Sequence, residues 1–569
     1  MYILGISCYY HDSAACILKD GKVIAAVEEE RYSRVKFDDG FPKLAIDYCM
    51  NEAGISPKDI DCIAFYDKSI LKFERLLDNY IGVAPRGLGS FLDVIPKWIH
   101  KRLWVKEEIK KYLRYSGKII FPEHHLSHAA YTFFTSPFKE SAILTVDGVG
   151  EWTTTSFGYA NGSTIKLTND LRWPHSLGLF YSAFTYYLGF KVNDGEYKLM
   201  GLSSYGKPKY YDLIMNELVD VKADGSLHLN MKYFAFTYDK IMINKKFEEL
   251  FECPIRKEDS KADQIHYDIG ASAQLVLEEI LLKMVLHVHK KTNQKYLCLG
   301  GGVALNGVAN YRILKEGPFE QIHIPPSPGD AGSAIGCAMY AYYSFYKHNR
   351  DLEIDTSTII SENTYLGPQH SNEEIKTFLE SKNISYEKYE RQNLLENVAK
   401  LISEQNVVGW YQGRMEWGPR ALGNRSILAD PRNAKMKDIL NEKIKHRESF
   451  RPFAPSILEE YTSEYFDLEV QSPYMLLVAK VKKPDIIPAV THVDGTGRLQ
   501  TVSKNANPLY YDLIQEFFKL TGVPVLINTS MNVRGEPIVN TLEQAYAMIL
   551  KTDMDYLVMG NYIVSKGSN

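Results

Sequence analysis

The sequence lacks the cysteine arrangements typical of disulfide-stabilised domains and of cysteine-ligated zinc. Its 569 residues include only seven cysteines, an odd number, and no two of them stand in C-x-x-C spacing. Disulfide frameworks and cysteine-zinc modules are therefore disfavoured, and the pattern is typical of a protein in a reducing compartment. We expect a cytoplasmic protein.

Long apolar runs and a strong charge imbalance are missing as well. No uninterrupted apolar run reaches the length of about 18 residues that a membrane span needs. The N-terminal stretch has no basic region and carries His11 and Asp12, so it does not read as a signal peptide. The formal net charge of −4 gives no overall attraction to nucleic acid or to an anionic membrane. We expect neither partner and leave an oligomer open.

The chain is too long for one hydrophobic core, although its 45% apolar and 24% charged residues are those of an ordinary globular protein. Residues 349–370 are polar and weakly periodic, which favours a domain boundary there. We predict an N-terminal domain over residues 1–350 and a C-terminal domain over residues 365–569.

Two segments share a pattern of strands and turns. Residues 2–29 read as three strands separated by a polar turn and an Asp-Gly turn, and residues 141–166 repeat the pattern with different residues. In each segment a turn that contains Gly or Asp follows the first strand. Such a duplication is typical of the α/β fold of actin and the sugar kinases, in which both halves present turns to a phosphate.

Helical and strand patterns alternate through the rest of the chain. Apolar spacing predicts helices over 42–54 and 268–292. A buried strand at 296–299 leads through three glycines toward a helix from Val303. The C-terminal half shows strand patterns at 406–413, 474–482 and 523–530. The first of these reads as an edge strand, and both halves are predicted to be α/β.

The sequence EHHLSHAA contains a candidate metal site. On a helix, His124 and His128 emerge on one face about 6 Å apart at Cβ, while His125 points elsewhere. Asp147 and Asp330 follow strand-like runs at glycine-rich turns and would supply harder ligands. Such mixed ligation suits iron(II), manganese or zinc. The alternative, separate surface or hydrogen-bonded histidines, stays open on spacing alone.

Basic residues crowd between positions 414 and 451, although the whole protein is slightly acidic. The cluster comprises Arg414, Arg420, Arg425, Lys443, Lys445, Arg447 and Arg451. Guanidinium forks match phosphate oxygens, and the nearby glycines let backbone amides approach the same anion. A solvated helix face is the alternative, and we assign Lys435 and Lys437 to it. Later loops contribute further candidates, namely Arg498, Asn528, Ser530, Asn532 and Arg534.

Several long motifs make the sequence resemble a known family. They are EHHLSHAA, TVDGVGE, GEYKLMGLSSYGKP, GGVALN, PGDAGSAIG, GRMEWGPRALGNRSILADPRN, RESFRPFAPS and INTSMNVRGEPIV. In this order they resemble the NodU/CmcH family of carbamoyltransferases, which includes tobramycin carbamoyltransferase. Met531 replaces the phenylalanine expected at that position, an apolar exchange that affects only local packing.

The resemblance implies a fold and a set of site residues. The fold is an N-terminal actin-like (ASKHA) duplicated domain followed by a YrdC-like α/β domain. His124, His128, Asp147 and Asp330 are implied as ligands of a catalytic iron(II). Nucleotide and substrate contacts are implied for Lys198, Gly301, Gly302, Asn306, Arg414, Arg420, Arg425, Arg498, Asn528, Ser530 and Arg534. Catalytic roles are implied for Lys443, Arg447 and Arg451, and for His11 and Asp12 toward the acceptor hydroxyl. The alternative for His11 and Asp12 is a pair that caps a turn.

The implied activity is ATP-dependent O-carbamoyl transfer to a natural-product-like small molecule, as in antibiotic biosynthesis. Carbamoyl phosphate and ATP would be the co-substrates, with Mg²⁺ accompanying ATP, and a carbamoyl-adenylate would form in the C-terminal domain. An actin-like small-molecule kinase is the main alternative, but it leaves the arginine cluster without a role. An ATP-driven assembly protein predicts no iron, and a tRNA-modifying transferase is disfavoured because no long basic run exists.

Overall fold

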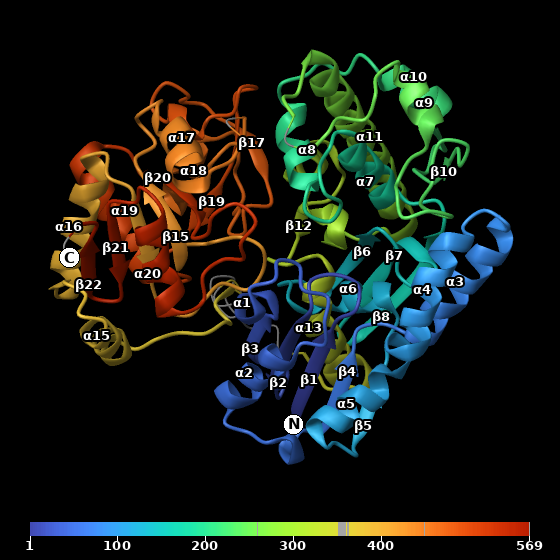
Figure 1. Ribbon diagram of the computed structural model, residues 1–569, viewed down its shortest axis with the longest axis horizontal. Coiled ribbons are helices and arrows are strands. Elements are labelled where there is room, and N and C mark those ends of the chain that lie inside the picture. Colours follow the sequence, from blue (N-terminus) through green and yellow to red (C-terminus); the bar gives the residue numbers. More distant parts are fainter. Residues whose placement is uncertain (259, 351–359, 361–363, 449, 568–569) are drawn as a thin grey trace. The chain divides into compact units, whose positions relative to one another are not determined.

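The computed structural model describes residues 1–258, 260–350, 360, 364–448 and 450–567 (Figure 1). Contacts divide the chain into two units. Unit 1 comprises residues 1–24, 39–42 and 49–352, and unit 2 comprises residues 25–38, 43–48 and 353–569. The predicted boundary segment 349–370 lies largely outside the described residues. Nothing in the sequence pattern had indicated that two short N-terminal segments would group with unit 2.

Two five-stranded sheets share one strand order. The first has the order β3-β2-β1-β4-β5, and the second has the order β8-β7-β6-β11-β12. In each sheet the first strand of the chain pairs antiparallel with the next strand and parallel with the strand on its other side. The bounds are β1 Tyr2–Ser7, β2 Ala14–Lys19, β3 Lys22–Glu28, β4 Cys62–Phe65, β5 Lys118–Ile120, β6 Glu140–Val146, β7 Thr153–Asn161, β8 Thr164–Arg172, β11 Tyr296–Gly300 and β12 Gln321–His323. The predicted duplicated actin-like fold is confirmed.

Helices cover these sheets, and two of them pack against each other. α6 and α13 are in mutual contact, α13 packs on β1, and α6 packs on β11. Their close approach is enforced at Gly336, where a Cβ would lie 2.0 Å from the Ser127 carbonyl oxygen. The helices of this part of the chain are α2 Lys43–Ala53, α3 Ser69–Val83, α4 Leu88–His100, α5 Val105–Leu113, α6 His124–Phe134, α7 Leu177–Tyr187, α8 Glu196–Ser203, α9 Tyr211–Glu217, α10 Lys245–Phe251, α11 Gln264–Thr292, α12 Gly307–Glu316 and α13 Ser333–Met339.

The predicted helix from Val303 begins later than expected. Residues Gly302–Leu305 form a short 3-10 turn, and α12 starts at Gly307 because the Asn306 side chain accepts a hydrogen bond from the Ala309 amide at 3.1 Å. Asparagine is among the best N-cap residues, so it fixes the start of the helix. The predictions for 2–29, 42–54 and 268–292 match β1 to β3, α2 and α11 closely.

Unit 2 is built on an eight-stranded mixed sheet with the order β13-β22-β21-β14-β15-β20-β16-β19. Its bounds are β13 Glu387–Lys388, β14 Val408–Tyr411, β15 Arg425–Ala429, β16 Ala454–Leu458, β19 Gln500–Val502, β20 Val525–Ser530, β21 Tyr556–Met559 and β22 Tyr562–Ser565, with the main helices α15 Asn372–Ser381, α16 Arg391–Ser403, α19 Pro508–Thr521 and α20 Leu542–Lys551. The expected second α/β unit is present.

Two details of unit 2 correct the sequence reading. β14 was predicted as an edge strand, but it is fully buried and pairs with β15 on one side and β21 on the other. The 474–482 pattern forms only the three-residue strand β17, Val478–Lys480, in a separate two-stranded sheet with β18, Thr496–Arg498. Within the described residues we find no helix that combines the length and apolar character needed to cross a bilayer.

Gly301, directly after β11, has no room for a side chain. Its φ is +87°, and a Cβ would lie 2.2 Å from the Val146 carbonyl oxygen. Gly301→Ala should therefore cost about 1–2 kcal/mol for the left-handed backbone and about 1–3 kcal/mol more for the clash. Gly162 is the matched control because its φ is +59° with nothing within 4 Å. Urea unfolding should show the larger loss for Gly301→Ala, and equal losses would contradict this account.

Candidate functional site

The first two turns of α6 supply two buried imidazoles. His124 and His128 are 0% and 1% exposed, and their Nε2 atoms lie 3.1 Å apart. This is the geometry expected from i, i+4 spacing on a helix. The neighbouring His125 turns away, with its Nδ1 2.7 Å from the Thr145 hydroxyl. The structure therefore places His124 and His128 together and His125 apart from them, as the helix spacing predicts.

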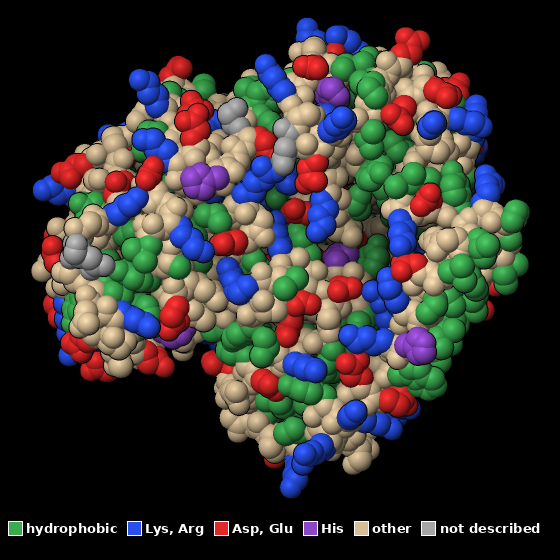
Figure 2. All heavy atoms as spheres, viewed as in Figure 1, with side chains coloured by type: hydrophobic (Ala, Val, Ile, Leu, Met, Phe, Trp, Pro, Cys, Tyr) green, Lys and Arg blue, Asp and Glu red, His purple; other side chains and the backbone are tan. Residues whose placement is uncertain are grey.

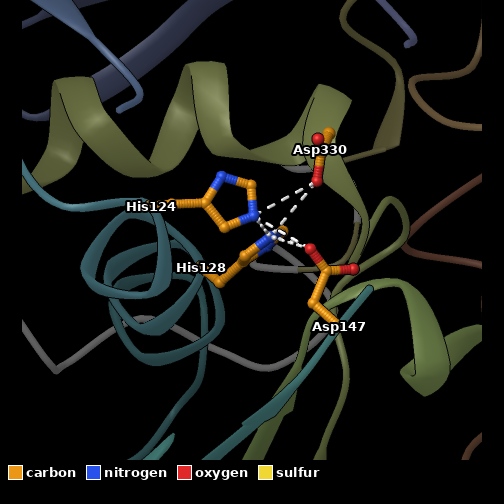
Figure 3. Close-up of side chains that lie close together, drawn as sticks. All are labelled: His124, His128, Asp147 and Asp330. Carbon is orange, nitrogen blue, oxygen red and sulfur yellow. Dashed lines mark hydrogen bonds and ion pairs between the residues drawn. The ribbon is translucent and has the colours of Figure 1, made fainter. Parts of the chain in front are cut away.

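Two carboxylates complete the group (Figure 3). Asp147 follows β6, and its Oδ2 lies 2.9 Å from His124 Nε2. Asp330 opens the turn before α13, and its Oδ1 lies 3.5 Å from His124 Nε2 and 3.4 Å from His128 Nε2. One candidate ligand atom from each of the four residues lies within 4.8 Å of the others. All four side chains point toward one centre, so the group could hold a metal ion.

The electrostatics of this group fit a cation. Asp330 is 1% exposed, and neither of its carboxylate oxygens accepts a hydrogen bond within the described residues. Although burial opposes it, the two carboxylates raise the pKa of His128 to about 9. Likewise the histidines outweigh burial and hold the pKa of Asp330 at about 2. Buried carboxylates without hydrogen-bond donors are costly, and a divalent cation bound to two imidazoles and two carboxylates would offset that cost.

Neighbouring groups orient the four side chains. Ser333 Oγ lies 3.3 Å from His128 Nδ1, so an Nδ1–H donated to this hydroxyl leaves Nε2 free to bind a metal. The Gly302 amide donates to Asp147 Oδ1 at 3.0 Å. Glu151 accepts the His124 backbone amide at 3.0 Å and thereby holds the start of α6. This second layer is typical of a metal site.

The nucleotide candidates of unit 1 lie around the ends of β6 and β11. Gly301 and Gly302 pass close to Val146 and Asp147, respectively. Asn306 is buried and exchanges two 3.0 Å hydrogen bonds with Gln274 of α11. Lys198 lies on α8, with its Nζ 3.8 Å from an Asp194 oxygen. Gly302 thus contacts the metal group directly, whereas the described residues show no hydrogen bond or ion pair between Lys198 and that group.

His11 and Asp12 lie beside the metal group. His11 Nδ1 is 2.9 Å from Asp12 Oδ2, and its Nε2 is 3.8 Å from Asp330 Oδ2. Burial lowers the pKa of His11, but Asp12 and Asp330 outweigh it and raise this pKa to about 10. The turn between β1 and β2 therefore reaches the centre, as the resemblance implied.

The basic cluster of unit 2 is centred on Lys445, which sequence reasoning did not assign to the site. Lys445 is 3% exposed, and its Nζ donates to Asn532 Oδ1 at 2.9 Å and to Ser530. Burial and the nearby Arg447, Arg451 and Lys36 hold its pKa well below the usual value. Lys443, assigned a catalytic role from the motif, is exposed instead. Lys443 and Lys445 stand two positions apart in the π-helical turn Leu440–Lys445, so they lie on different sides of it.

Two predicted arginines bind backbone carbonyls. Arg425 is 0% exposed, donates to the carbonyls of Gln412 and Pro368 at 2.5 and 2.9 Å, and stacks 3.7 Å from the Tyr411 ring centre. Arg414 donates to the Leu366 carbonyl at 2.6 Å. These contacts hold loops of unit 2 together, and they give no support to an anion-binding role for Arg425.

The remaining candidates differ in how far their side chains are buried. Asn528 is 1% exposed, and its amide donates to Ser456 and Gln500 at 3.1 and 3.0 Å, which fixes three strands to one another. Arg534 is exposed and lies 3.8 Å from Glu448. Arg420, Arg498, Ser530, Arg447 and Arg451 are half-buried. Ser530 and Asn532 join the Lys445 group, as their place in one motif suggested.

Metal content tests the unit 1 site. His128→Ala and Asp330→Asn remove ligands, so both should lose most of the metal that the wild type retains after desalting. Ser333→Ala removes only an orienting contact and should weaken metal affinity roughly 10-fold. Elemental analysis measures the content, and His125→Gln is the control because it lies on the same helix outside the group. Equal metal content in all variants would contradict the site.

Anion binding tests the unit 2 cluster. Inorganic phosphate should raise the thermal unfolding midpoint of the protein, because an anion offsets the buried positive charge. Lys445→Met should lose most of this rise, whereas Lys435→Met, on the exposed surface, should keep it. If Lys443→Met lost the rise and Lys445→Met kept it, the assignment to Lys445 would be wrong.

Comparisons with known proteins place the chain in a family. The carbamoyltransferase N-terminus model matches residues 2–339, and the carbamoyltransferase C-terminus model matches residues 399–566. An uncharacterised protein of Synechocystis sp. is 49% identical over 99% of this chain and 97% of its own length. The nodulation protein NolNO of Sinorhizobium fredii is 37% identical, covering 98% of this chain and 79% of that protein.

Among solved structures, component A of the Acidaminococcus fermentans (R)-2-hydroxyglutaryl-CoA dehydratase matches with a TM-score of 0.33 and 18% identity, covering 61% of this chain and all of that chain. The two family models together cover most of the sequence, and the nearly full-length relatives agree with them. The chain belongs to the carbamoyltransferase family and is a carbamoyltransferase.

Proposed function

We propose that this carbamoyltransferase uses ATP to activate carbamoyl phosphate and passes the carbamoyl group to a hydroxyl of a natural-product-like small molecule. The observation that carries the proposal is the buried group of His124, His128, Asp147 and Asp330, which no sugar kinase chemistry requires. The positive cluster around Lys445 supports a second, anion-binding step in the other unit.

The first step belongs to the residue 365–569 domain. Carbamoyl phosphate takes up one water to release phosphate and carbamate, and a carbamate oxygen then attacks the α-phosphorus of ATP. Pyrophosphate leaves and carbamoyl-adenylate forms. The two reactants are both anions, so their approach costs repulsion that Lys445, Arg447 and Arg451 would offset. The half-buried Arg420, Arg498 and Ser530 would add further contacts.

The second step belongs to the residue 1–350 domain. The acceptor oxygen attacks the carbamoyl carbon, the bond from that carbon to the AMP oxygen breaks, and the hydroxyl proton is released. His11, hydrogen-bonded to Asp12, is the group proposed to handle that proton. Gly302 and Asn306 would hold the nucleotide beside Asp147. Exclusion of water protects the carbamoyl group from hydrolysis during transfer.

The four-residue group fits iron(II), and manganese or zinc would suit the same donors. His124, His128, Asp147 and Asp330 would hold the ion. When bound, it supplies Lewis-acid stabilisation of the charge on the departing phosphate. Mg²⁺ would accompany ATP, because it prefers phosphate oxygens and water as ligands.

Product analysis tests the activation step. The purified protein, incubated with ATP, carbamoyl phosphate and iron(II) without an acceptor, should release pyrophosphate only when carbamoyl phosphate is present. Phosphate from carbamoyl phosphate should appear together with the pyrophosphate, and AMP should follow as the adenylate hydrolyses. Release of ADP that does not depend on carbamoyl phosphate would contradict the proposal and favour a small-molecule kinase.

The two units can be tested separately when an acceptor alcohol is added to this assay. His124→Ala should keep carbamoyl-phosphate-dependent pyrophosphate release and lose carbamoyl transfer, because it alters only the unit 1 site. Lys445→Met should reduce pyrophosphate release. If His124→Ala retained wild-type rates in both steps, the assigned role of the metal group would be wrong.

A further inference from the structure

Helix α3 buries two cations rather than apolar side chains. Its two buried residues are Lys72 and Arg75, at 6% and 7% exposure. The apolar residues of the helix are half-buried or exposed, and Ile70 and Ile81, at either end, are 74% and 75% exposed. The buried positions of an amphipathic helix are usually apolar. The burial of two cations on this helix therefore needs a physical explanation.

Lys72 has a counter-charge. Its Nζ lies 2.5 Å from Asp67 Oδ2 and 3.5 Å from the Tyr66 hydroxyl. The carboxylates nearby outweigh burial and raise the pKa of Lys72. This ion pair accounts for the burial of Lys72 without any ligand.

Arg75 has no such partner. Within the described residues its guanidinium makes no hydrogen bond and no ion pair, and its Nε is shielded from solvent. Its guanidinium lies over the face of Trp173, 4.9 Å from the ring centre. Burial lowers the pKa of Arg75 to about 10, although Tyr10 and Glu151 act in the opposite sense. A buried charge without a counter-charge costs several kcal/mol, so an anion that reaches Arg75 gains a strong partner.

The surroundings of Arg75 adjoin the metal group. Glu151, whose charge acts on Arg75, is bound by the His124 backbone amide. The Tyr10 hydroxyl approaches Gly148, the residue after Asp147, and it has no hydrogen-bond partner within the described residues. Burial is the main cause that raises the pKa of Tyr10; the charges of Asp147 and Asp330 raise it further, while that of Arg75 lowers it. Tyr10 is thus the neighbour shared by the metal group and Arg75.

The residues of this region come from other segments of the chain than the nucleotide candidates. Arg75, Tyr10 and Trp173 come from α3, the β1–β2 turn and the segment after β8. Gly301, Gly302 and Asn306 come from the segment between β11 and α12. Figure 2 shows that unit 1 is hollowed on this face, over the region that β6 and α7 occupy in Figure 1. The start of α7 is tied to the same place, because Ser176 donates to the Gly148 carbonyl at 2.7 Å.

We propose that Arg75 binds a carboxylate or phosphate group of the acceptor, so that the acceptor is an anionic alcohol. The inference rests on the proposed function for its acceptor role. The guanidinium would donate hydrogen bonds to two oxygens of that carboxylate or phosphate group. The Tyr10 hydroxyl would add a further hydrogen bond. Binding at this point places the hydroxyl of the same molecule toward the metal group. A guanidinium fork suits both carboxylate and phosphate oxygens.

Binding of small probes to the iron-loaded protein tests this assignment by equilibrium dialysis. The probes are glycolate and glycerol 3-phosphate, each compared with a neutral alcohol, glycolamide and glycerol. The wild type should prefer the anionic member, and the better of the two pairs identifies carboxylate or phosphate. Arg75→Met should weaken that binding about 10- to 100-fold, as loss of a charge-assisted hydrogen bond does. Failure of the wild type to bind either anion, or unchanged binding in Arg75→Met, overturns the inference.

Controls separate this result from other causes. Arg172→Met alters an exposed arginine paired with Asp170 and should bind the probes as the wild type does. Arg75→Met should keep AMP binding and carbamoyl-phosphate-dependent pyrophosphate release, so failure of the proposed function shows independently in the wild type. The thermal midpoint of Arg75→Met should not fall, because an uncompensated charge is removed. A lower midpoint with unchanged probe binding would make Arg75 structural, and a loss of AMP binding would move it to the nucleotide.

Discussion

Two carboxylates and two imidazoles are buried together at one point of unit 1, and this arrangement constrains what surrounds it. Asp330 is 1% exposed, and its carboxylate accepts no hydrogen bond from the described residues, so a positive charge in the centre of the group would stabilise it. Its residues come from α6, the end of β6 and the turn before α13. The duplicated sheets bring these three segments together, and glycines at the contacts let the backbones approach. The fold of unit 1 can therefore be understood as a support for this group.

Each unit also buries a basic side chain that forms no ion pair with a carboxylate among the described residues. Lys445 in unit 2 donates only to neutral oxygens, and Arg75 in unit 1 stacks on an indole. Such groups reduce stability, and natural sequences retain them where function requires charge. Both residues are arranged to receive an anion from outside the chain. The substrates of the proposed reaction, carbamoyl phosphate and ATP, are themselves anions.

Much of unit 1 could be predicted from the sequence, because its signals are local. The i, i+4 spacing of His124 and His128 places both imidazoles on one helix face, and a strand that ends in a glycine turn exposes Asp147. The duplicated strand pattern likewise repeats within a short stretch. The same turn pattern pointed to Asp330, which lies far along the chain from the others, and the resemblance to a family then implied all four residues as ligands of one metal ion.

Other features depend on contacts between distant segments, and the sequence did not reveal them. The sequence predicts β14 as an edge strand, but β21, residues 556–559, pairs with the edge that was expected to be free. Lys443 and Lys445 have the same side chain and lie in one π-helical turn, but only Lys445 is buried. Arg425 lies in a motif that is typical of phosphate binding, but its guanidinium donates hydrogen bonds to backbone carbonyls of two loops. The burial of Lys72 and Arg75 on α3 was not predicted either, because the exposure of a side chain cannot be read from composition.

The most direct test of the account is the coordination of the metal in unit 1. X-ray absorption spectroscopy of the iron(II)-loaded protein measures the donor atoms around the ion without any knowledge of the acceptor. The account predicts one iron per chain with only nitrogen and oxygen donors, two of them imidazoles. A sulfur donor, or a shell without histidine, would contradict it, because the seven cysteines and the remaining carboxylates lie outside the group of His124, His128, Asp147 and Asp330.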